Sequence, residues 1–258
     1  MDRLTIFWML MAATVALFLW GLVVNVSIYR AGRRRAPAEA PPDGLGARRV
    51  LGALLADGLF HRALFRESKW RWAAHTLFSI GFLLLFALST FTGFFEEILH
   101  RGFGVATPFV LAVVDKDTPI MALLNEVLGL PLVVGLVAIL VRRYALRPAQ
   151  LRTEADDTWV LALLGVGLLT GYPLEAVRFL AEGTAPAAGS ISFIGYPLAQ
   201  ALRPLALPWE AWHFALFFVH VLPFMALLVY MPYSKFFHVL VGPIVATVNA
   251  LRRGEAAR

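Results

Sequence analysis

Three of the six histidines lie in one apolar stretch near the end of the 258-residue chain. His213, His220 and His238 are separated by 7 and 18 residues, or about two and five turns of an α-helix with 3.6 residues per turn. On a continuous helix all three would therefore point to one face, with His220 and His238 about 27 Å apart along the axis. Pro223 and Pro232 can kink such a helix, which weakens the alignment.

A fourth histidine, His75, begins another long apolar stretch directly after KWRW. This places His75 at the depth predicted for His238, near the same end of the spans. Two neutral imidazoles on facing helices at one depth are what a bis-histidine b-type haem requires. Arg66, Arg71 and Lys235 lie near enough in the sequence to pair with haem propionates. The pattern predicts His75 and His238 as axial ligands of one haem.

Other interpretations of these histidines remain open. A histidine at the end of a span can be an interfacial residue, and Lys235 can simply extend its ammonium toward water. A second haem could use His220, but the span of His75 has no histidine at that depth, only residues such as Leu85, Ser89 and Thr92. His213 is a further candidate ligand, whereas a structural role is favoured for His100.

Composition identifies the elements that must carry these side chains. The chain is 59% hydrophobic and 16% charged, with mean hydropathy +0.72, which is typical of integral membrane proteins. A helix needs about 20 apolar residues to cross the hydrocarbon core. Five stretches reach that length: about 5–28, 73–95, 119–141, 158–180 and 211–231. We expect an all-α integral membrane protein, a five-transmembrane-helix bundle forming one membrane domain over residues 1–258.

Basic residues indicate the orientation of the bundle. Ten of the 23 Lys and Arg residues lie in 30–71, four in 142–152 and four from Lys235 onward. Positive charge favours the cytoplasmic side, so we expect the N-terminus outside and the C-terminus inside. Residues 30–71 then form a basic cytoplasmic loop, and 236–258 a cytoplasmic tail that continues the last span as a bent segment. This topology explains the net charge of +6, so the charge does not indicate nucleic-acid binding.

Two further apolar stretches, 102–114 and 187–207, are too short or too interrupted to cross, and fit interfacial or re-entrant pieces. Cysteine is absent. This chain therefore cannot hold disulfides, cysteine-ligated iron–sulfur clusters or c-type haem, and any such centre must belong to a partner.

Three stretches carry a resemblance to a known family. Residues 213–243 read HFALFFVHVLPFMALLVYMPYSKFFHVLVGP, residues 71–86 read RWAAHTLFSIGFLLLF, and residues 152–179 read RTEADDTWVLALLGVGLLTGYPLEAVRF. They resemble the respiratory nitrate reductase gamma subunit and its relatives, the membrane cytochromes b of heterodisulfide reductase and dissimilatory sulfite reduction complexes. The resemblance implies that His75, His220 and His238 carry haem. In the span that carries His75, the nitrate reductase subunit has a second histidine where this chain has Leu85. This difference favours the heterodisulfide reductase and sulfite reduction relatives.

The resemblance implies a quinone-linked electron relay in a prokaryotic cytoplasmic (inner) membrane. Electrons would pass through b-type haem between the quinone pool and a cytoplasmic iron–sulfur subunit, in either direction. Glu126, beside Asn125, and Glu175, paired with Arg178, are candidates for quinone proton chemistry, although ordinary interfacial ion pairs would look the same. The alternative function is a non-redox membrane anchor or a transporter without haem, but we find no inverted repeat.

Overall fold

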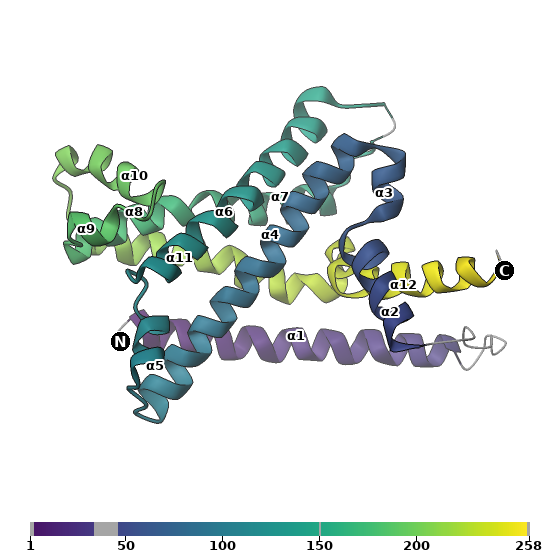
Figure 1. The fold of residues 1–258 in the computed structure, drawn as a ribbon, viewed down its shortest axis with the longest axis horizontal. Helices are drawn as coiled ribbons and strands as arrows, with labels where there is room; N and C mark the ends of the chain where they lie inside the picture. The colour runs from purple at the N-terminus through teal and green to yellow at the C-terminus, as the bar shows by residue number, and fades with distance from the viewer. Residues whose placement is uncertain (1–2, 34–45, 150, 257–258) are drawn as a thin grey trace. The chain divides into compact units, whose positions relative to one another are not determined.

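The computed structural model describes residues 3–33, 46–149 and 151–256. The chain is 86% helical, and its described residues form no β-strand (Figure 1). Within them, the helices long and apolar enough to cross a membrane are Arg3–Gly32, Lys69–Gly102, Pro108–Leu146, Ala155–Glu182 and Trp209–Tyr233. The predicted all-α fold with five membrane-crossing helices is therefore confirmed. The predicted sidedness of the termini stays a prediction.

The chain divides into two compact units. The first comprises Met1–Ala73, Ala149–Leu164 and Leu222–Arg258, and the second comprises Ala74–Pro148 and Gly165–Val221. The single membrane domain expected over 1–258 stays a prediction. Part of the expected basic loop, residues 34–45, lies outside the described residues.

In the first unit, the N-terminal helix α1 (Arg3–Arg33) packs on the short turn η5 (Met231–Tyr233). A Cβ added at Gly21 would lie 2.7 Å from the Pro232 ring, so the close approach requires glycine at this position. One turn along, Asn25 Nδ2 donates a hydrogen bond of 2.8 Å to Pro232 O. Helix α1 is thereby joined to the segment that precedes His238.

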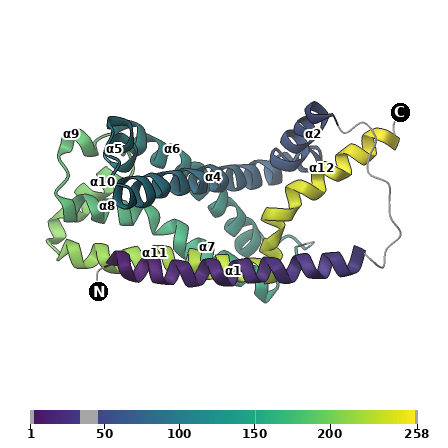
Figure 2. The ribbon, with the colours of Figure 1, turned by 90° about the horizontal axis from the view of Figure 1, so that it is seen from below.

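The remaining part of the first unit is more helical than a loop would be. Residues expected as a basic loop form α2 (Ala47–Ala53), η1 (Leu54–Leu59) and α3 (Arg62–Glu67). The C-terminal helix α12 (His238–Ala256) packs against α2 and η1, as Figures 1 and 2 both show. Arg49 Nη2 donates to Leu251 O at 3.0 Å, which satisfies a carbonyl near the end of α12.

In the second unit, α4 (Lys69–Gly93) and α6 (Pro119–Leu140) approach closely through glycines. A Cβ on Gly81 would lie 3.0 Å from Leu132 N, and one on Gly135 would lie 2.5 Å from Phe78 N. Small residues let helix backbones come close where the hydrophobic effect cannot drive association, as in lipid. Helix α6 is followed by η3 (Val141–Leu146).

Helix α4 continues into η2 (Phe94–Gly102), and short helices form in the two stretches judged unable to cross. They are α5 (Pro108–Val114), α9 (Pro186–Gly189), α10 (Gly195–Leu202) and η4 (Arg203–Leu205). Helix α10 packs on α8 (Gly171–Glu182) around Ala176, Phe179 and Ala199 (Figure 1). This packing brings the α9–α10 turn against two carboxylates described below.

The predicted span 158–180 contains a break. Helix α7 (Ala155–Leu169) ends before Thr170, and α8 begins at Gly171. Pro173 explains the interruption, because it has no N–H to donate to the carbonyl of Leu169. The break exposes backbone carbonyls and the Thr170 hydroxyl to side chains of neighbouring helices.

His213 and His238 do not lie on one continuous helix, the condition on which the alignment of all three histidines depended. Helix α11 (Trp209–Tyr230) is followed by η5, an extended Ser234 with φ −119° and ψ 169°, and η6 (Lys235–Phe237). Pro232 cannot donate a helical hydrogen bond, and Ser234 Oγ accepts from Phe236 N at 3.1 Å, which begins a new helical turn. The helical spacing therefore aligns His213 with His220, but it does not extend to His238.

Candidate functional site

His220 is held by the break between α7 and α8. Its Nδ1 lies 3.2 Å from Thr170 Oγ1, whose own hydroxyl is within donating distance of Val166 O at 2.7 Å and Gly167 O at 2.9 Å. When Thr170 gives its proton to a carbonyl, its oxygen can accept from the Nδ1–H of His220. In that tautomer Nε2 carries the lone pair, as an iron-ligating imidazole requires.

His238 has the same tautomer from a different source. Its Nδ1 lies 2.7 Å from Lys235 O, three residues earlier. A carbonyl oxygen can only accept, so Nδ1 bears the proton and Nε2 bears the lone pair. The side chain is exposed at the first residue of α12. His238 is therefore oriented as an Nε2 ligand by its own backbone turn.

The polar contacts around this turn come from the start of α7. Asp156 Oδ1 accepts from Tyr230 Oη at 2.5 Å, and Asp156 Oδ2 accepts from Lys235 N at 3.1 Å. Asp157 Oδ2 accepts from Glu154 N at 3.1 Å, which is one half of a capping box. The acidic run that begins α7 thus binds the end of α11 and the turn before His238.

Two of the three cations predicted to pair with haem propionates, Arg71 and Lys235, have carboxylate partners. Arg71 Nη1 lies 2.5 Å from Glu67 Oε1. Lys235 Nζ lies 2.5 Å from Glu154 Oε2 and 3.5 Å from Asp157 Oδ1. Hydrogen bonding to Glu154, helped by the charge of Asp157, raises the pKa of Lys235. Pairing of either cation with a propionate stays a prediction.

The other histidines fall in different places. His75 is half-buried on α4 in the second unit, so its pairing with His238, a residue of the first unit, stays a prediction. His213 lies on α11, two turns before His220. His100 Nδ1 lies 3.1 Å from Val105 O and ties the end of η2 to the next turn, which supports the structural role expected for it.

His61 was given no role by the sequence, and the structure places it near His238. Burial, and then the electrostatic interaction with the nearby His238, lower the pKa of His61. His61 has a left-handed backbone, with φ 49°, in the corner between η1 and α3. No spacing rule could have found it, because the segment shows no helical periodicity that relates it to the last span.

Glu126 is fully buried in the second unit, with 0% of its surface exposed. Its carboxylate accepts backbone hydrogen bonds from Ile194 N at 3.1 Å and Gly195 N at 2.8 Å. Tyr172 Oη donates to the Glu126 carbonyl at 3.0 Å. The alternative interpretation of Glu126 was an ordinary ion pair at the membrane interface. The partners of its carboxylate are instead backbone N–H groups.

Glu175 lies beside Glu126. Its Oε1 accepts from Ser192 Oγ at 3.0 Å. A Cβ added at Gly195 would collide with Glu175 Oε2, and the backbone N–H of the same Gly195 donates to the Glu126 carboxylate. The two carboxyl groups therefore both adjoin Gly195, and carboxyl groups are side chains that can accept and release protons.

Arg178 does not make the expected pair with Glu175. Its guanidinium binds Asp117 Oδ1 and Glu182 Oε2, each at 2.7 Å. Thr184 Oγ1 also donates to Asp117, at 3.2 Å. The expected i, i+3 pairing is replaced because Glu182, at i+4, and Asp117 from the turn before α6 offer better geometry.

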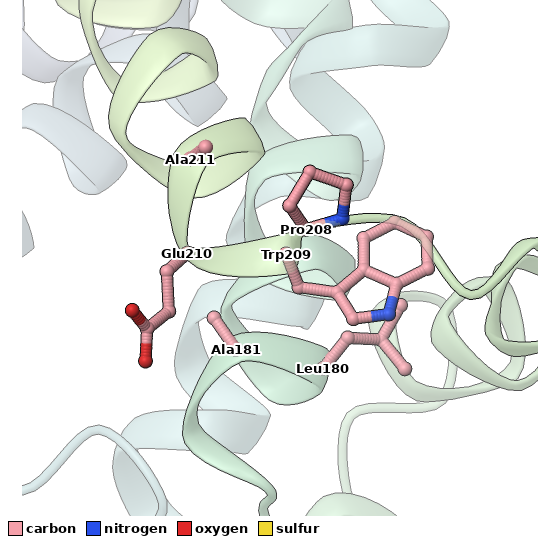
Figure 3. A pocket seen from close by; sticks show the side chains of 6 residues that line it. All are labelled: Leu180, Ala181, Pro208, Trp209, Glu210 and Ala211. Atoms are coloured by element: carbon pink, nitrogen blue, oxygen red, sulfur yellow. The ribbon is translucent and has the colours of Figure 1, made fainter.

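A shallow recess lies between the end of α8 and the start of α11. Its lining is Leu180, Ala181, Pro208, Trp209, Glu210 and Ala211. In Figure 3 the Trp209 ring lies over Leu180, while the Glu210 carboxylate points away from the ring. In the part of the chain that the structure describes, no three His, Asp or Glu side chains gather to hold a bare metal ion.

Curated relatives share most of the chain's length. The chain is 26% identical to a subunit of the dihydromethanophenazine:CoB–CoM heterodisulfide reductase of Methanosarcina acetivorans, covering 96% of this chain and 93% of the relative. The corresponding protein of Methanosarcina mazei is 26% identical over 93% of this chain and 91% of its own length. That of Methanosarcina thermophila is 28% identical, over 93% and 89% respectively.

No family model matches the chain, and no solved structure matches it. The matched relatives are named as subunits of a reductase complex, and similarity over nearly the whole length makes the chain a homologue of that membrane subunit. Together with the five apolar helices, this supports a multi-pass protein of a prokaryotic cytoplasmic membrane. Membership in the wider nitrate reductase gamma-like group is not shown.

Proposed function

We propose that this protein is the membrane electron-transfer subunit of a redox complex. It exchanges electrons between a lipid-soluble two-electron carrier and a cytoplasmic partner subunit through b-type haem. The observation that carries the proposal is that Nδ1 of both His220 and His238 lies within hydrogen-bonding distance of an oxygen, an arrangement that suits Nε2 as the ligand atom. The relatives support it, because their names describe a reductase subunit.

The haem proposal assigns His238 and His75 to one iron and His220 to a possible second, with His213 as a further candidate. When bound, haem supplies a one-electron carrier within the low-dielectric interior. The protein's part is to fix imidazole orientation and to keep Nε2 deprotonated. Arg71 and Lys235 remain candidates for the propionates, at the cost of their present carboxylate partners.

The carrier is proposed to be a quinone or, as in the names of the relatives, a reduced phenazine. The reduced form of either carrier, a quinol or a dihydrophenazine, loses two protons and two electrons when it is oxidised. Glu126 and Glu175 are the proposed proton acceptors, since they form a buried carboxyl pair with backbone and hydroxyl donors around it. Because this chain has no cysteine, the partner is proposed to supply iron–sulfur clusters.

An absorbance spectrum tests the haem proposal. Purified protein reduced with dithionite should show the bands of b-type haem, and His238→Ala or His75→Ala should remove those of the haem that they share. His100→Gln is the matched control and should keep them, because His100 binds a backbone carbonyl.

Unchanged spectra in both variants would refute the ligand assignment. Protein that stays colourless when haem is supplied would instead support the alternative, a non-redox anchor or transporter.

A further inference from the structure

The contacts around Asp156 form a continuous chain that ends at His238. Asp156 Oδ2 accepts from Lys235 N at 3.1 Å, and the carbonyl of the same Lys235 accepts from His238 Nδ1 at 2.7 Å. The other oxygen, Oδ1, accepts from Tyr230 Oη at 2.5 Å, at the last residue of α11. One carboxylate therefore binds both ends of the η5–η6 turn, and all four residues belong to the first unit.

The turn itself has little regular structure to hold it. Between α11 and α12 the backbone passes through two separate 3₁₀ turns and an extended Ser234. The main-chain atoms that contact His238 thus depend on hydrogen bonds from outside the turn. Asn25 donates one to Pro232 O in η5, and Asp156 accepts one from Lys235 N, the first residue of η6. Asp156 lies in the first turn of α7, where the helix dipole also favours its negative charge.

Ionised aspartate suits this position because both of its oxygens only accept, and both of its partners are donors. Asparagine would keep one accepting oxygen and place an NH₂ group against a donor. A hydrogen bond to the outer nitrogen of a metal-binding histidine fixes its tautomer and ring orientation and raises its basicity. Asp156 binds the N–H of Lys235, and the carbonyl of Lys235 accepts from His238. A change at Asp156 would therefore alter the orientation and basicity of His238, and through them any metal that His238 binds.

We propose that Asp156 is a positioning residue for His238: it holds the Lys235 peptide so that Lys235 O keeps the proton on Nδ1 and leaves the lone pair on Nε2. The haem part of this statement rests on the proposed function. The tautomer part concerns this chain alone and is measurable without haem.

The first experiment is ¹⁵N NMR of histidine-labelled protein in detergent, with His238→Gln used to assign the signal. We expect wild-type His238 to be in the Nδ1–H form, and Asp156→Asn to give a mixture of tautomers. Asp156→Glu, which keeps both carboxylate oxygens, should restore most of the wild-type signal. Asp115→Asn is the matched control, because it makes the same charge change at an aspartate that also accepts from a backbone N–H, that of Asp117, and not from the turn before His238.

The second experiment measures the midpoint potential of the haem-loaded protein. Asp156→Asn should retain haem but shift the potential upward, since a less basic imidazole stabilises ferric iron less. Asp115→Asn should not shift it. Tyr230→Phe removes one donor and leaves the bond to Lys235 N, so it should give a smaller shift, and it replaces Asp156→Asn if that variant does not fold.

The outcomes separate the two proposals. A wild-type tautomer and potential in Asp156→Asn and Tyr230→Phe would overturn the positioning role while leaving the haem intact. Absence of haem from wild-type protein would refute the proposed function, and the tautomer measurement would still decide the role of Asp156.

Discussion

His220 and His238 reach the same protonation pattern by different routes. His220 uses a side chain from another helix, Thr170, whereas His238 uses the carbonyl of Lys235 in its own turn. The sequence predicted both as ligands from their type and spacing. It could not predict Thr170, because the contact exists only where α7 breaks, nor Asp156, which acts on a residue 79 positions away.

The buried carboxyl pair leads to a prediction about turnover. Glu175→Gln should slow oxidation of duroquinol or a reduced phenazine about 100-fold, because a positioned proton acceptor contributes that much or more. The haem spectrum should be unchanged. Turnover is measured by the reduction of haem in membrane vesicles.

Glu210→Gln is the control for this variant, since it removes a carboxylate from the recess at the start of α11. Equal turnover in Glu175→Gln and wild type would leave Glu175 with only a structural role.

Helix interruptions decide where the functional side chains meet. Pro173 ends α7 beside His220, and Pro232 and Ser234 end the helical run before His238. Both prolines were visible in the sequence, and Pro232 was recognised as a possible kink. The size of the interruption was not predictable from the sequence. Proline removes one helical hydrogen bond, and the contacts around it then decide whether the helix bends or stops.

Close packing of α4 on α6 leads to a stability prediction. Gly135→Ala places a methyl group against the backbone of Phe78, so it should destabilise the protein by about 1–3 kcal/mol. Thermal unfolding in detergent would show this as a lower Tm. Gly165→Ala on α7 is the control, because nothing lies within 4 Å of an added Cβ there. A Tm equal to that of wild type in Gly135→Ala would contradict the close packing.

Topology is a property of the whole chain that the basic residues predict and the fold does not test. The absence of cysteine allows a direct measurement, because any single cysteine introduced is the sole thiol. In oriented vesicles, Leu146→Cys should react with an impermeant maleimide from the cytoplasmic side only. Glu210→Cys should react from the opposite side only. The reverse pattern would mean that the N-terminus lies inside.

The sequence by itself determined that this protein is an all-helical membrane protein with five crossings, because apolar length and lipid's lack of hydrogen-bond partners leave no other backbone solution. It also identified the histidines and Glu126 and Glu175, because few ionisable residues occur in spans. Only the tertiary structure decided their partners: Thr170 for His220, Ser192 for Glu175, and Asp156 for the turn at His238. These pairings join residues far apart in the chain, and helix breaks and packing, rather than periodicity, bring them together.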